Sequence, residues 1–508
     1  MEKIKNNDNP SELGIGVNDS RLRAGVAKSD ITTGEKGRII KDPLYAKVLV
    51  LNDGITKITL ITMDTTAIGG RRISQGMLPD VGEDFMPMLR ARIEKELGIP
   101  GLNVLVNASH THPPGRFLCE DKELLDRVFD AVRRASQSMV EVKTGAGSGY
   151  EDRISMNRTL RLKNGSHWTI RHSNPCPPDD EVEALGPLDP EIGIIRIDRL
   201  DGSPFAVVYN FACHPLWGDY EGRITANFPG YASKVIEDSL GHEAMAFFLQ
   251  GAAGDVCDVT FKNFERVRDV ECLGTTLGLS TLKALSRIET KDAKIKVMSE
   301  TIMLPRRTDI PEKIEKLEKE QSELLASLRS TSLNFKSFLP LFMKYKLNHD
   351  YPSDYAFNYL KSEKTERLEL VAMDSFNRGN VDKYLRNIQA MEILARIQDD
   401  IATLRKHQAI NEESGTSVIE AEVMGIKIGE CALISAPLEA LVEIGLNIKK
   451  ASPLKHTFMA AYSNGYMHYG APASYYDKGG YEVTECLLAP EWQEIYERKA
   501  KKIILKLK

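Results

Sequence analysis

The sequence predicts a layered α/β fold with mixed sheets, interrupted by an inserted helical hairpin. Three observations lead to this prediction. From residue 20 to 305, short β-like runs alternate with helical stretches. Residues 306–415 change to long, charged, helix-favouring sequence, and residues 416–508 return to strands and helices. Because alternation of this kind is typical of sheets covered by helices, we expect one catalytic body built from 20–305 and 416–508, with 306–415 as a helical insertion.

Short apolar runs mark the strands of the body. In its first part they are YAKVLVL, KITLITMD, LNVLVNASH, EIGIIRID, PFAVVYNFACH and AMAFFLQ, and in its second part SVIEAEVMGIKIG, CALISAP and TFMAAYS. Stretches with helical character lie near residues 84–97, 121–139, 229–240, 262–287, 438–450 and 490–504. The order of these elements predicts that the same α/β body resumes after the insertion.

Two segments of the insertion carry apolar residues at helical spacing. The first has Ile314, Leu317, Leu324 and Leu328, and the second has Leu385, Ile388, Met391, Leu394, Ile397, Ile401 and Leu404. Two antiparallel helices are the simplest interpretation. The aromatic-rich, proline-containing segment 334–360 between them predicts a packed connector, and we hypothesise that it roofs the active-site pocket. Long amphipathic helices often form oligomer contacts, so a homo-oligomer formed through the insertion is expected.

Composition excludes several classes of function. A net charge of −5 over 508 residues, with no basic stripe, argues against a nucleic-acid partner. No run reaches 18 apolar residues, so no transmembrane segment is predicted. The N-terminal residues lack the apolar core of a secretory signal, and the seven scattered cysteines contain no CxxC pair. We therefore expect a cytoplasmic protein, or an exported one whose signal is missing from this chain.

The stretch VNASHTHPPGR places His110 and His112 at the end of an apolar run. If that run is a strand through His112, the two side chains share one face and lie about 7 Å apart. The following prolines would end the strand, and ligands of α/β folds commonly bind beyond the carboxyl ends of strands. VVYNFACHP delivers His214 in the same context. The histidines are either metal ligands or hydrogen-bonded residues at a strand edge.

A set of motifs, in order along the chain, resembles the neutral/alkaline (non-lysosomal) ceramidase family. The motifs are VNASHTHPPG, MNRTL, NFACHP with NFPGYAS, GAAGDVCD, SAPLEALVEIG and SNGYMHY with GGYEV, preceded by RAGVAKSDITTG. The resemblance covers roughly residues 20–305 and 416–490, and the helical segment between them is unmatched. It implies a ceramidase-like catalytic domain and a zinc hydrolase that acts on a small-molecule amide.

By position in these motifs, the resemblance implies that the zinc ligands are His110, His214, Glu439 and Tyr469. Two imidazoles and two oxygen ligands leave room for a water molecule, as a catalytic zinc requires. Two alternatives are open. Glu439 could be an acid favoured by the dipole in the first turn of a helix, and Tyr469 could be a core tyrosine.

Three further positions match residues that line the family's site. His112 is the candidate proton shuttle or hydrogen-bond donor, and its alternative role is only to orient a ligand. Arg158 and Tyr481 are candidates for binding substrate oxygen atoms or the product carboxylate. Their alternative interpretations are a solvated arginine and a packed tyrosine.

The chain departs from the family pattern at several points. The segment GDVCD stands where ceramidases have GDVSPN, so Cys257 replaces a serine and is either a reactive thiolate or an inert buried thiol. APLEA stands where the family has PGEFT, and the family's C-terminal immunoglobulin-like domain is expected to be missing. These departures favour a soluble substrate over ceramide itself.

The sequence therefore predicts a zinc-dependent hydrolase in which metal-activated water cleaves an amide (N-acyl) bond of a soluble substrate. One alternative is a metal-dependent enzyme acting on a carbohydrate or another polar metabolite by hydrolysis or elimination. A polar pocket with Trp217, Asp219, Tyr220 and Arg223 would favour it. A second alternative is an inactive scaffold that assembles through the insertion.

Overall fold

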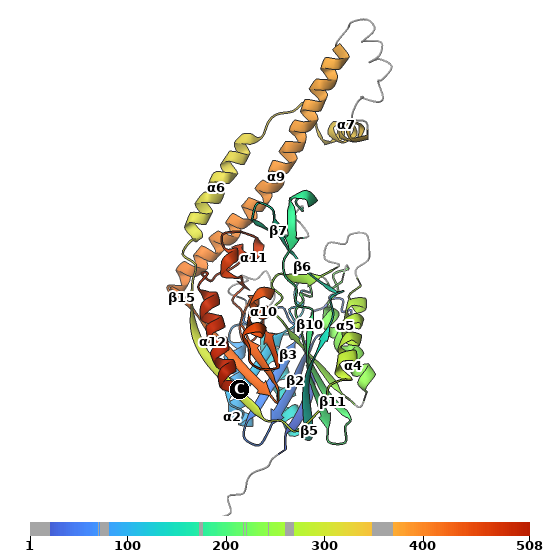
Figure 1. Ribbon diagram of the computed structural model, residues 1–508, viewed down its shortest axis with the longest axis vertical. Helices are drawn as coiled ribbons and strands as arrows, with labels where there is room; N and C mark the ends of the chain where they lie inside the picture. Colours follow the sequence, from blue (N-terminus) through green and yellow to red (C-terminus); the bar gives the residue numbers. More distant parts are fainter. Residues whose placement is uncertain are drawn as a thin grey trace, which may run out of the picture.

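The structure is a computed structural model that describes residues 21–69, 71, 81–171, 176–216, 218–219, 221–241, 243–259, 269–347 and 369–508. Two large sheets form the body, with helices on their outer faces, and a long helical arm leaves it at one end (Figure 1). The predicted fold class, mixed α/β with a helical insertion, is confirmed.

The larger sheet has eight strands in the order β12-β11-β10-β5-β1-β2-β3-β4. Their bounds are β1 (Arg23–Asp30), β2 (Tyr45–Asn52), β3 (Lys57–Met63), β4 (Val104–Ala108), β5 (Val140–Tyr150), β10 (Glu191–Arg199), β11 (Pro204–Phe211) and β12 (Met245–Gln250). The outermost pairs, β3 with β4 and β11 with β12, are parallel, and the other neighbours are antiparallel. Each edge of the sheet therefore ends in a parallel pair.

The second sheet has the order β14-β15-β16-β18 and packs on the inner face of the first. Its strands are β14 (Ile295–Pro305), β15 (Val418–Ile428), β16 (Cys431–Ser435) and β18 (His456–Ala460), with β16 and β18 parallel. Alternation along β2 shows the layering: Leu49 joins the core between the sheets, with Leu433 and Phe458, whereas Val48 joins the core beneath the helices.

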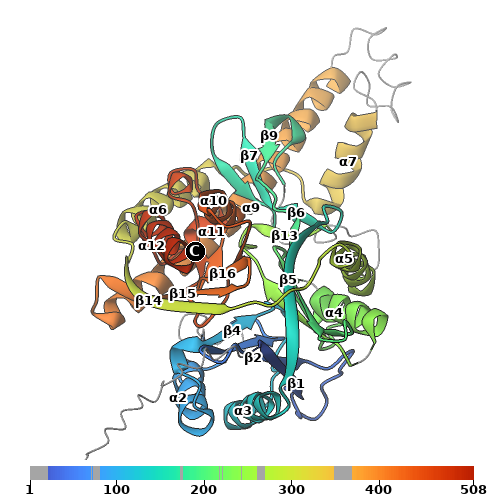
Figure 2. The ribbon, with the colours of Figure 1, turned by 60° about the horizontal axis from the view of Figure 1, so that its bottom comes forward.

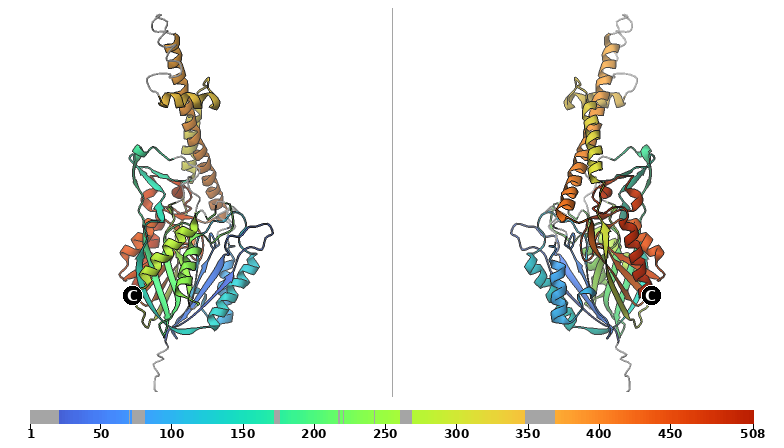
Figure 3. Two further views of the ribbon diagram at one scale, coloured as in Figure 1. Left: turned by 90° about the vertical axis from the view of Figure 1, so that its right-hand side faces the viewer. Right: turned by 90° about the vertical axis from the view of Figure 1, so that its left-hand side faces the viewer.

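Helices cover the outer faces of both sheets (Figures 2 and 3). The helices are α2 (Phe85–Leu97) and α3 (Asp121–Gln137) beside β1–β4, α4 (Asn227–Leu240) and α5 (Val270–Leu285) beside β5 and β10–β12, and α10 (Val442–Ala451) and α12 (Trp492–Leu507) on the smaller sheet. The body is therefore a sandwich of two sheets between two layers of helices.

Short elements gather at the end of the body where the arm begins (Figure 2). They are the ladders of β6 (Ser155–Asn157) with β13 (Val256–Asp258), of β17 (Glu439–Ala440) with β19 (Tyr469–Gly470), and of β7 (Thr159–Leu162) with β8 (His167–Thr169) and β9 (Val182–Leu185). Short helices are α11 (Tyr481–Thr484) and the 3₁₀ turns Gly101–Asn103, Asp179–Glu181 and Ala473–Tyr475. The carboxyl ends of β4, β11, β12 and β16 lead toward this end.

The insertion contains α6 (Ile310–Ser327), α7 (Phe335–Leu347) and α9 (Glu369–Ser414). Helices α6 and α9 pack through an apolar cluster of Ile310, Ile314, Ile397, Ile401 and Leu404. Helix α7 packs on the outer half of α9 through Phe338, Tyr345 and Val381, far from the body (Figure 1). The hypothesis that segment 334–360 roofs the pocket is therefore wrong for 335–347, and residues 348–360 lie outside the described part of the chain.

The surface of the insertion carries exposed apolar side chains. They are Leu325, Phe335, Leu339, Met343, Leu347, Met373, Phe376 and Met391. Self-association through this surface stays a prediction. Among the described residues, no helix combines the length and the apolar character that crossing a bilayer requires.

Candidate metal centre

The backbone of the segment that carries His110 and His112 differs from the strand predicted from the sequence. Strand β4 ends at Ala108, and His110 has the left-handed φ of 66°. The backbone N–H of Ala108 donates to Tyr462 and that of His110 donates to Thr65, so partners from two other segments bend the chain. The expected placement of His110 and His112 on one strand face about 7 Å apart is wrong. Their rings meet edge to face with centroids 4.4 Å apart.

The rings of His110 and His214 are oriented by backbone carbonyl groups. The Nδ1 atom of His110 lies 2.6 Å from the Thr66 oxygen, and Nδ1 of His214 lies 2.5 Å from the Ala253 oxygen. A carbonyl oxygen can only accept a hydrogen bond, so each Nδ1 must carry the proton. In a neutral ring the Nε2 atom then presents a lone pair.

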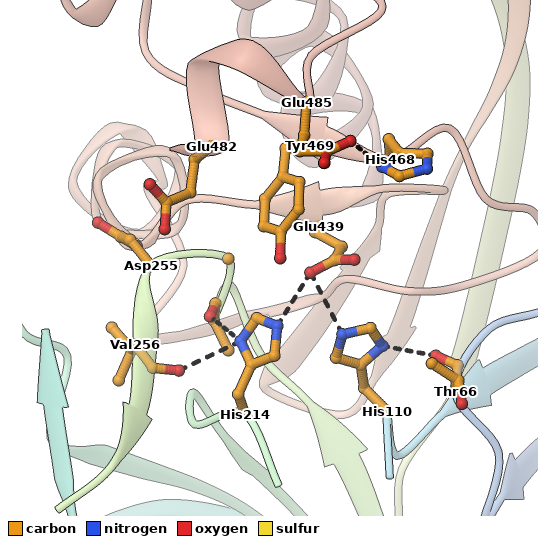
Figure 4. Close-up of polar contacts among 12 residues, drawn as sticks. Thr66, His110, His214, Asp255, Val256, Glu439, His468, Tyr469, Glu482 and Glu485 are labelled. Carbon is orange, nitrogen blue, oxygen red and sulfur yellow. Dashed lines mark hydrogen bonds and ion pairs between the residues drawn. The ribbon is translucent and has the colours of Figure 1, made fainter. Parts of the chain in front are cut away.

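Glu439 lies between the two histidines (Figure 4). Its Oε2 atom is 2.9 Å from Nε2 of His214 and 3.2 Å from Nε2 of His110. Tyr466 donates a hydrogen bond from its hydroxyl to the other oxygen, Oε1, at 2.5 Å. Glu439 belongs to β17, and α10 begins only at Val442, so the interpretation of a first-turn helix acid is not supported.

The strand β19 brings Tyr469 to the same place. Tyr469 is the register partner of Glu439 in the parallel ladder, and its hydroxyl points toward the space between Glu439 and His214 (Figure 4). That hydroxyl accepts a hydrogen bond of 2.9 Å from Arg158. All four residues implied as zinc ligands therefore converge on one buried space.

The chemistry of this donor set fits a cation. Burial, with the neighbouring His110, lowers the pKa of His214 to about 4, so this ring is neutral at neutral pH. Glu439 Oε2 faces the Nε2 atoms of both rings. Lone pairs that face an ionised carboxylate repel it unless a positive charge lies between them. Nitrogen and carboxylate ligands suit zinc.

The candidate catalytic residues surround the same space. Arg158 is buried and donates to Glu482 at 2.7 Å and to the Gly254 carbonyl at 2.8 Å, besides Tyr469. The ring of Tyr481 lies 5.6 Å from that of Tyr469, centroid to centroid. His112 has a buried Nε2 atom that finds no hydrogen-bond partner among the residues that the structure describes. Arg158 is thus not a solvated side chain.

Cys257 lies beside the site on β13, opposite His214 in an isolated bridge. Its side chain packs with Leu160, Leu162 and Ile170 and is fully buried. Burial raises the pKa of the thiol to about 12, so the group stays protonated at neutral pH. This environment favours the interpretation of an inert buried thiol.

Gln250, which the motif analysis missed, connects the two histidine segments. Its buried side-chain Nε2 donates to the carbonyl of Ser109 at 3.0 Å and to that of Cys213 at 2.8 Å. These residues immediately precede His110 and His214. A glutamine at the end of the apolar run AMAFFLQ was the available signal, because a buried amide needs partners.

The described residues give little support to the polar pocket that would favour a carbohydrate substrate. Asp219 accepts hydrogen bonds of 2.9 and 2.8 Å from Arg223 and forms an ion pair with Lys41. The positions of Trp217 and Tyr220 lie outside the described residues.

Comparison with known proteins identifies solved structures that share this fold. The sequence matches no protein-family model and no curated protein. Among solved structures, the neutral ceramidase from Pseudomonas aeruginosa is 16% identical, with a TM-score of 0.60 over 96% of this chain and 75% of that one. A structure described as ceramidase complexed with C2 is 15% identical, with the same TM-score and coverage. The chain has the neutral ceramidase fold. The resemblance drawn from the motifs is thereby confirmed at the level of the fold.

Proposed function

We propose that this chain is a zinc-dependent amidohydrolase that cleaves an N-acyl amide bond of a small molecule. The observation that carries the proposal is the convergence of His110, His214 and Glu439, with both Nδ1 atoms fixed on carbonyl groups, in a fold shared with neutral ceramidases. Zinc held by these residues and Tyr469 would polarise the amide carbonyl and lower the pKa of a bound water molecule.

His112 is the candidate proton acceptor. The ring of His112 lies against that of His110, with the two centroids 4.4 Å apart. Its Nε2 atom has no hydrogen-bond partner among the described residues. A neutral imidazole with a vacant ring nitrogen can hold a proton and pass it to a leaving amine.

Arg158 and Tyr481 are the candidates for binding substrate oxygen. Glu482 and the Gly254 carbonyl fix the guanidinium of Arg158 in the site. Because the group is already in place, substrate binding requires little reorganisation of it. Burial raises the pKa of Tyr481, which keeps its hydroxyl protonated and able to donate.

Charged residues beside Tyr481 support a polar, soluble substrate over a lipid. The guanidinium of Arg171 lies 3.9 Å from the centroid of the Tyr481 ring, and Arg396 of α9 lies 4.3 Å from that of Trp168. Burial raises the pKa of Asp400, also on α9, to about 6, and Arg396 and Arg171 counteract that rise. Charged groups at this place favour a substrate that carries polar groups over a purely apolar one.

The test combines metal analysis with a substrate screen. Purified protein should contain zinc and should hydrolyse members of a panel of N-acyl amino acids, N-acyl amines, amino-sugar amides and short-chain ceramides. His110→Ala should abolish hydrolysis, whereas His456→Ala, which alters a histidine on β18 outside the cluster, should not. Equal hydrolysis by wild type and His110→Ala would exclude the proposal. Turnover of sugars without amide cleavage would favour the carbohydrate alternative, and zinc-free, inactive protein that assembles would favour the scaffold.

A further inference from the structure

A second cluster of side chains of the types that bind metal ions lies where the insertion meets the body. It consists of His407 on α9, His468 immediately before β19, and Glu485 immediately after α11, and their ligand atoms all lie within 4.8 Å of one another. Glu485 Oε2 is 3.5 Å from Nε2 of His407 and 3.5 Å from Nδ1 of His468. Figure 4 shows the contact between Glu485 and His468.

Within the described ranges, the ring nitrogens of this group have no hydrogen-bond partners. Neither nitrogen of His407 and neither nitrogen of His468 makes a hydrogen bond of acceptable geometry in the described part of the chain. His407 is fully buried, and His468 and Glu485 are each 8% exposed. Burying such groups without partners is unfavourable, and native proteins rarely accumulate them in one place.

The spacing of the three groups fits metal coordination better than hydrogen bonding. An N–H···O hydrogen bond has a length of about 2.7–3.2 Å, which both 3.5 Å contacts exceed. Zinc bonds of about 2.0–2.1 Å at tetrahedral angles place neighbouring donor atoms about 3.3 Å apart.

We propose that His407, His468 and Glu485 bind a second divalent transition-metal ion of the zinc class. Two imidazoles and a carboxylate are a ligand set that zinc accepts. The proposal concerns a site separate from that of His110 and does not depend on the function assigned above.

This second ion would fasten the helical insertion to the catalytic segment. His407 comes from α9, while His468 directly precedes Tyr469, and the backbone N–H of Glu485 donates to the carbonyl of Tyr481. The proposed role of the second ion is structural, because its surroundings are buried.

Zinc stoichiometry tests the proposal. Protein stripped with a chelator and titrated with Zn²⁺ should bind about two ions per chain in wild type and about one in either His407→Gln or Glu485→Gln. His110→Ala should also bind about one Zn²⁺, because it loses the candidate catalytic site and keeps the second site. The double variant His110→Ala/His407→Gln lacks both sites and should bind none. The matched control, His456→Gln, should bind as many ions as wild type.

Unfolding gives a second measurement that does not depend on catalysis. Added Zn²⁺ should raise the unfolding midpoint of His110→Ala, and His407→Gln combined with His110→Ala should remove that rise. Wild-type stoichiometry in both His407→Gln and Glu485→Gln would overturn the proposal. So would a single zinc that His110→Ala removes completely, because the second cluster would then be only a buried histidine and glutamate group. A single zinc that His407→Gln removes would instead support this site and contradict the catalytic one.

Discussion

Glu439 and Tyr469 are direct register partners in a parallel ladder of two short strands. Paired residues of neighbouring parallel strands project to the same side, and here that side is the space that His110 and His214 also face. The ladder therefore delivers two oxygen groups from distant segments to one point. The ladder has only two residue pairs, and its role is to position these side chains.

Replacing Tyr469 by Phe should weaken zinc binding while preserving the fold. The substitution removes the hydroxyl that accepts from Arg158 and points into the site, but it retains the ring packing. We expect zinc affinity to fall by about 10-fold or more, measured by competition with a chromophoric chelator. Tyr476→Phe removes another buried hydroxyl, bonded to the Leu488 carbonyl, and should leave the affinity unchanged. Equal affinity in all three proteins would exclude Tyr469 as a ligand.

Replacing Gln250 by Leu should separate the two histidine segments. The carbonyls of Ser109 and Cys213 would lose their shared donor, at a cost of about 1–3 kcal/mol in the free energy of unfolding. Zinc affinity should fall by about 10- to 100-fold, as for other residues that orient ligands.

The control for Gln250 is another buried amide. Asn210 donates to the carbonyls of Leu249 and Met459, neither of which precedes a candidate ligand. Asn210→Leu should reduce stability by a similar amount without changing zinc affinity. If both variants lost the same affinity, the effect of Gln250 would be general destabilisation.

Arg158→Met should destabilise the protein because it leaves Glu482 buried without its cation. Breaking a buried ion pair by removing one partner costs about 3–5 kcal/mol, measurable by urea unfolding. The double variant Arg158→Met/Glu482→Gln should regain part of this stability. Its kcat/KM should stay as low as that of the single variant, since the guanidinium is absent from both. Recovery of activity together with stability would show that Arg158 acts only through the ion pair.

His167 should make stability depend on pH. Burial, with Lys478 and Arg161 nearby, lowers the pKa of His167 from 6.5 to about 4 in the folded protein. Between these pH values the unfolded chain binds more protons, so the free energy of unfolding should fall as the pH falls from 6.5 to 4 and should not change through this group above 6.5. His167→Gln should make that fall shallower in urea titrations. An unchanged slope would show that other groups cause the pH dependence.

The sequence by itself indicated many strands of the two large sheets, though not β1, β5 or β14, most of the long helices of the body, and candidate residues for the site. Period and composition place β2, β3, β10, β11 and β12 and the helices α2, α3, α4 and α12 close to their observed bounds, because these patterns depend on neighbours within one element. The motifs also pointed to His110 and His214, whose context of apolar run and terminating turn is local.

Only the tertiary structure decided how these side chains are aimed. His110 turns into the site through a left-handed backbone conformation. The Tyr462 carbonyl bonds to the N–H of Ala108, and the Thr65 carbonyl bonds to that of His110. Glu439 lies in a ladder rather than in a helix, and Gln250 and His407 reach their partners from other parts of the chain. Such contacts join segments far apart in sequence, so no local period encodes them. Side-chain direction beyond the end of a strand is set by backbone angles, which the packing of the whole body determines.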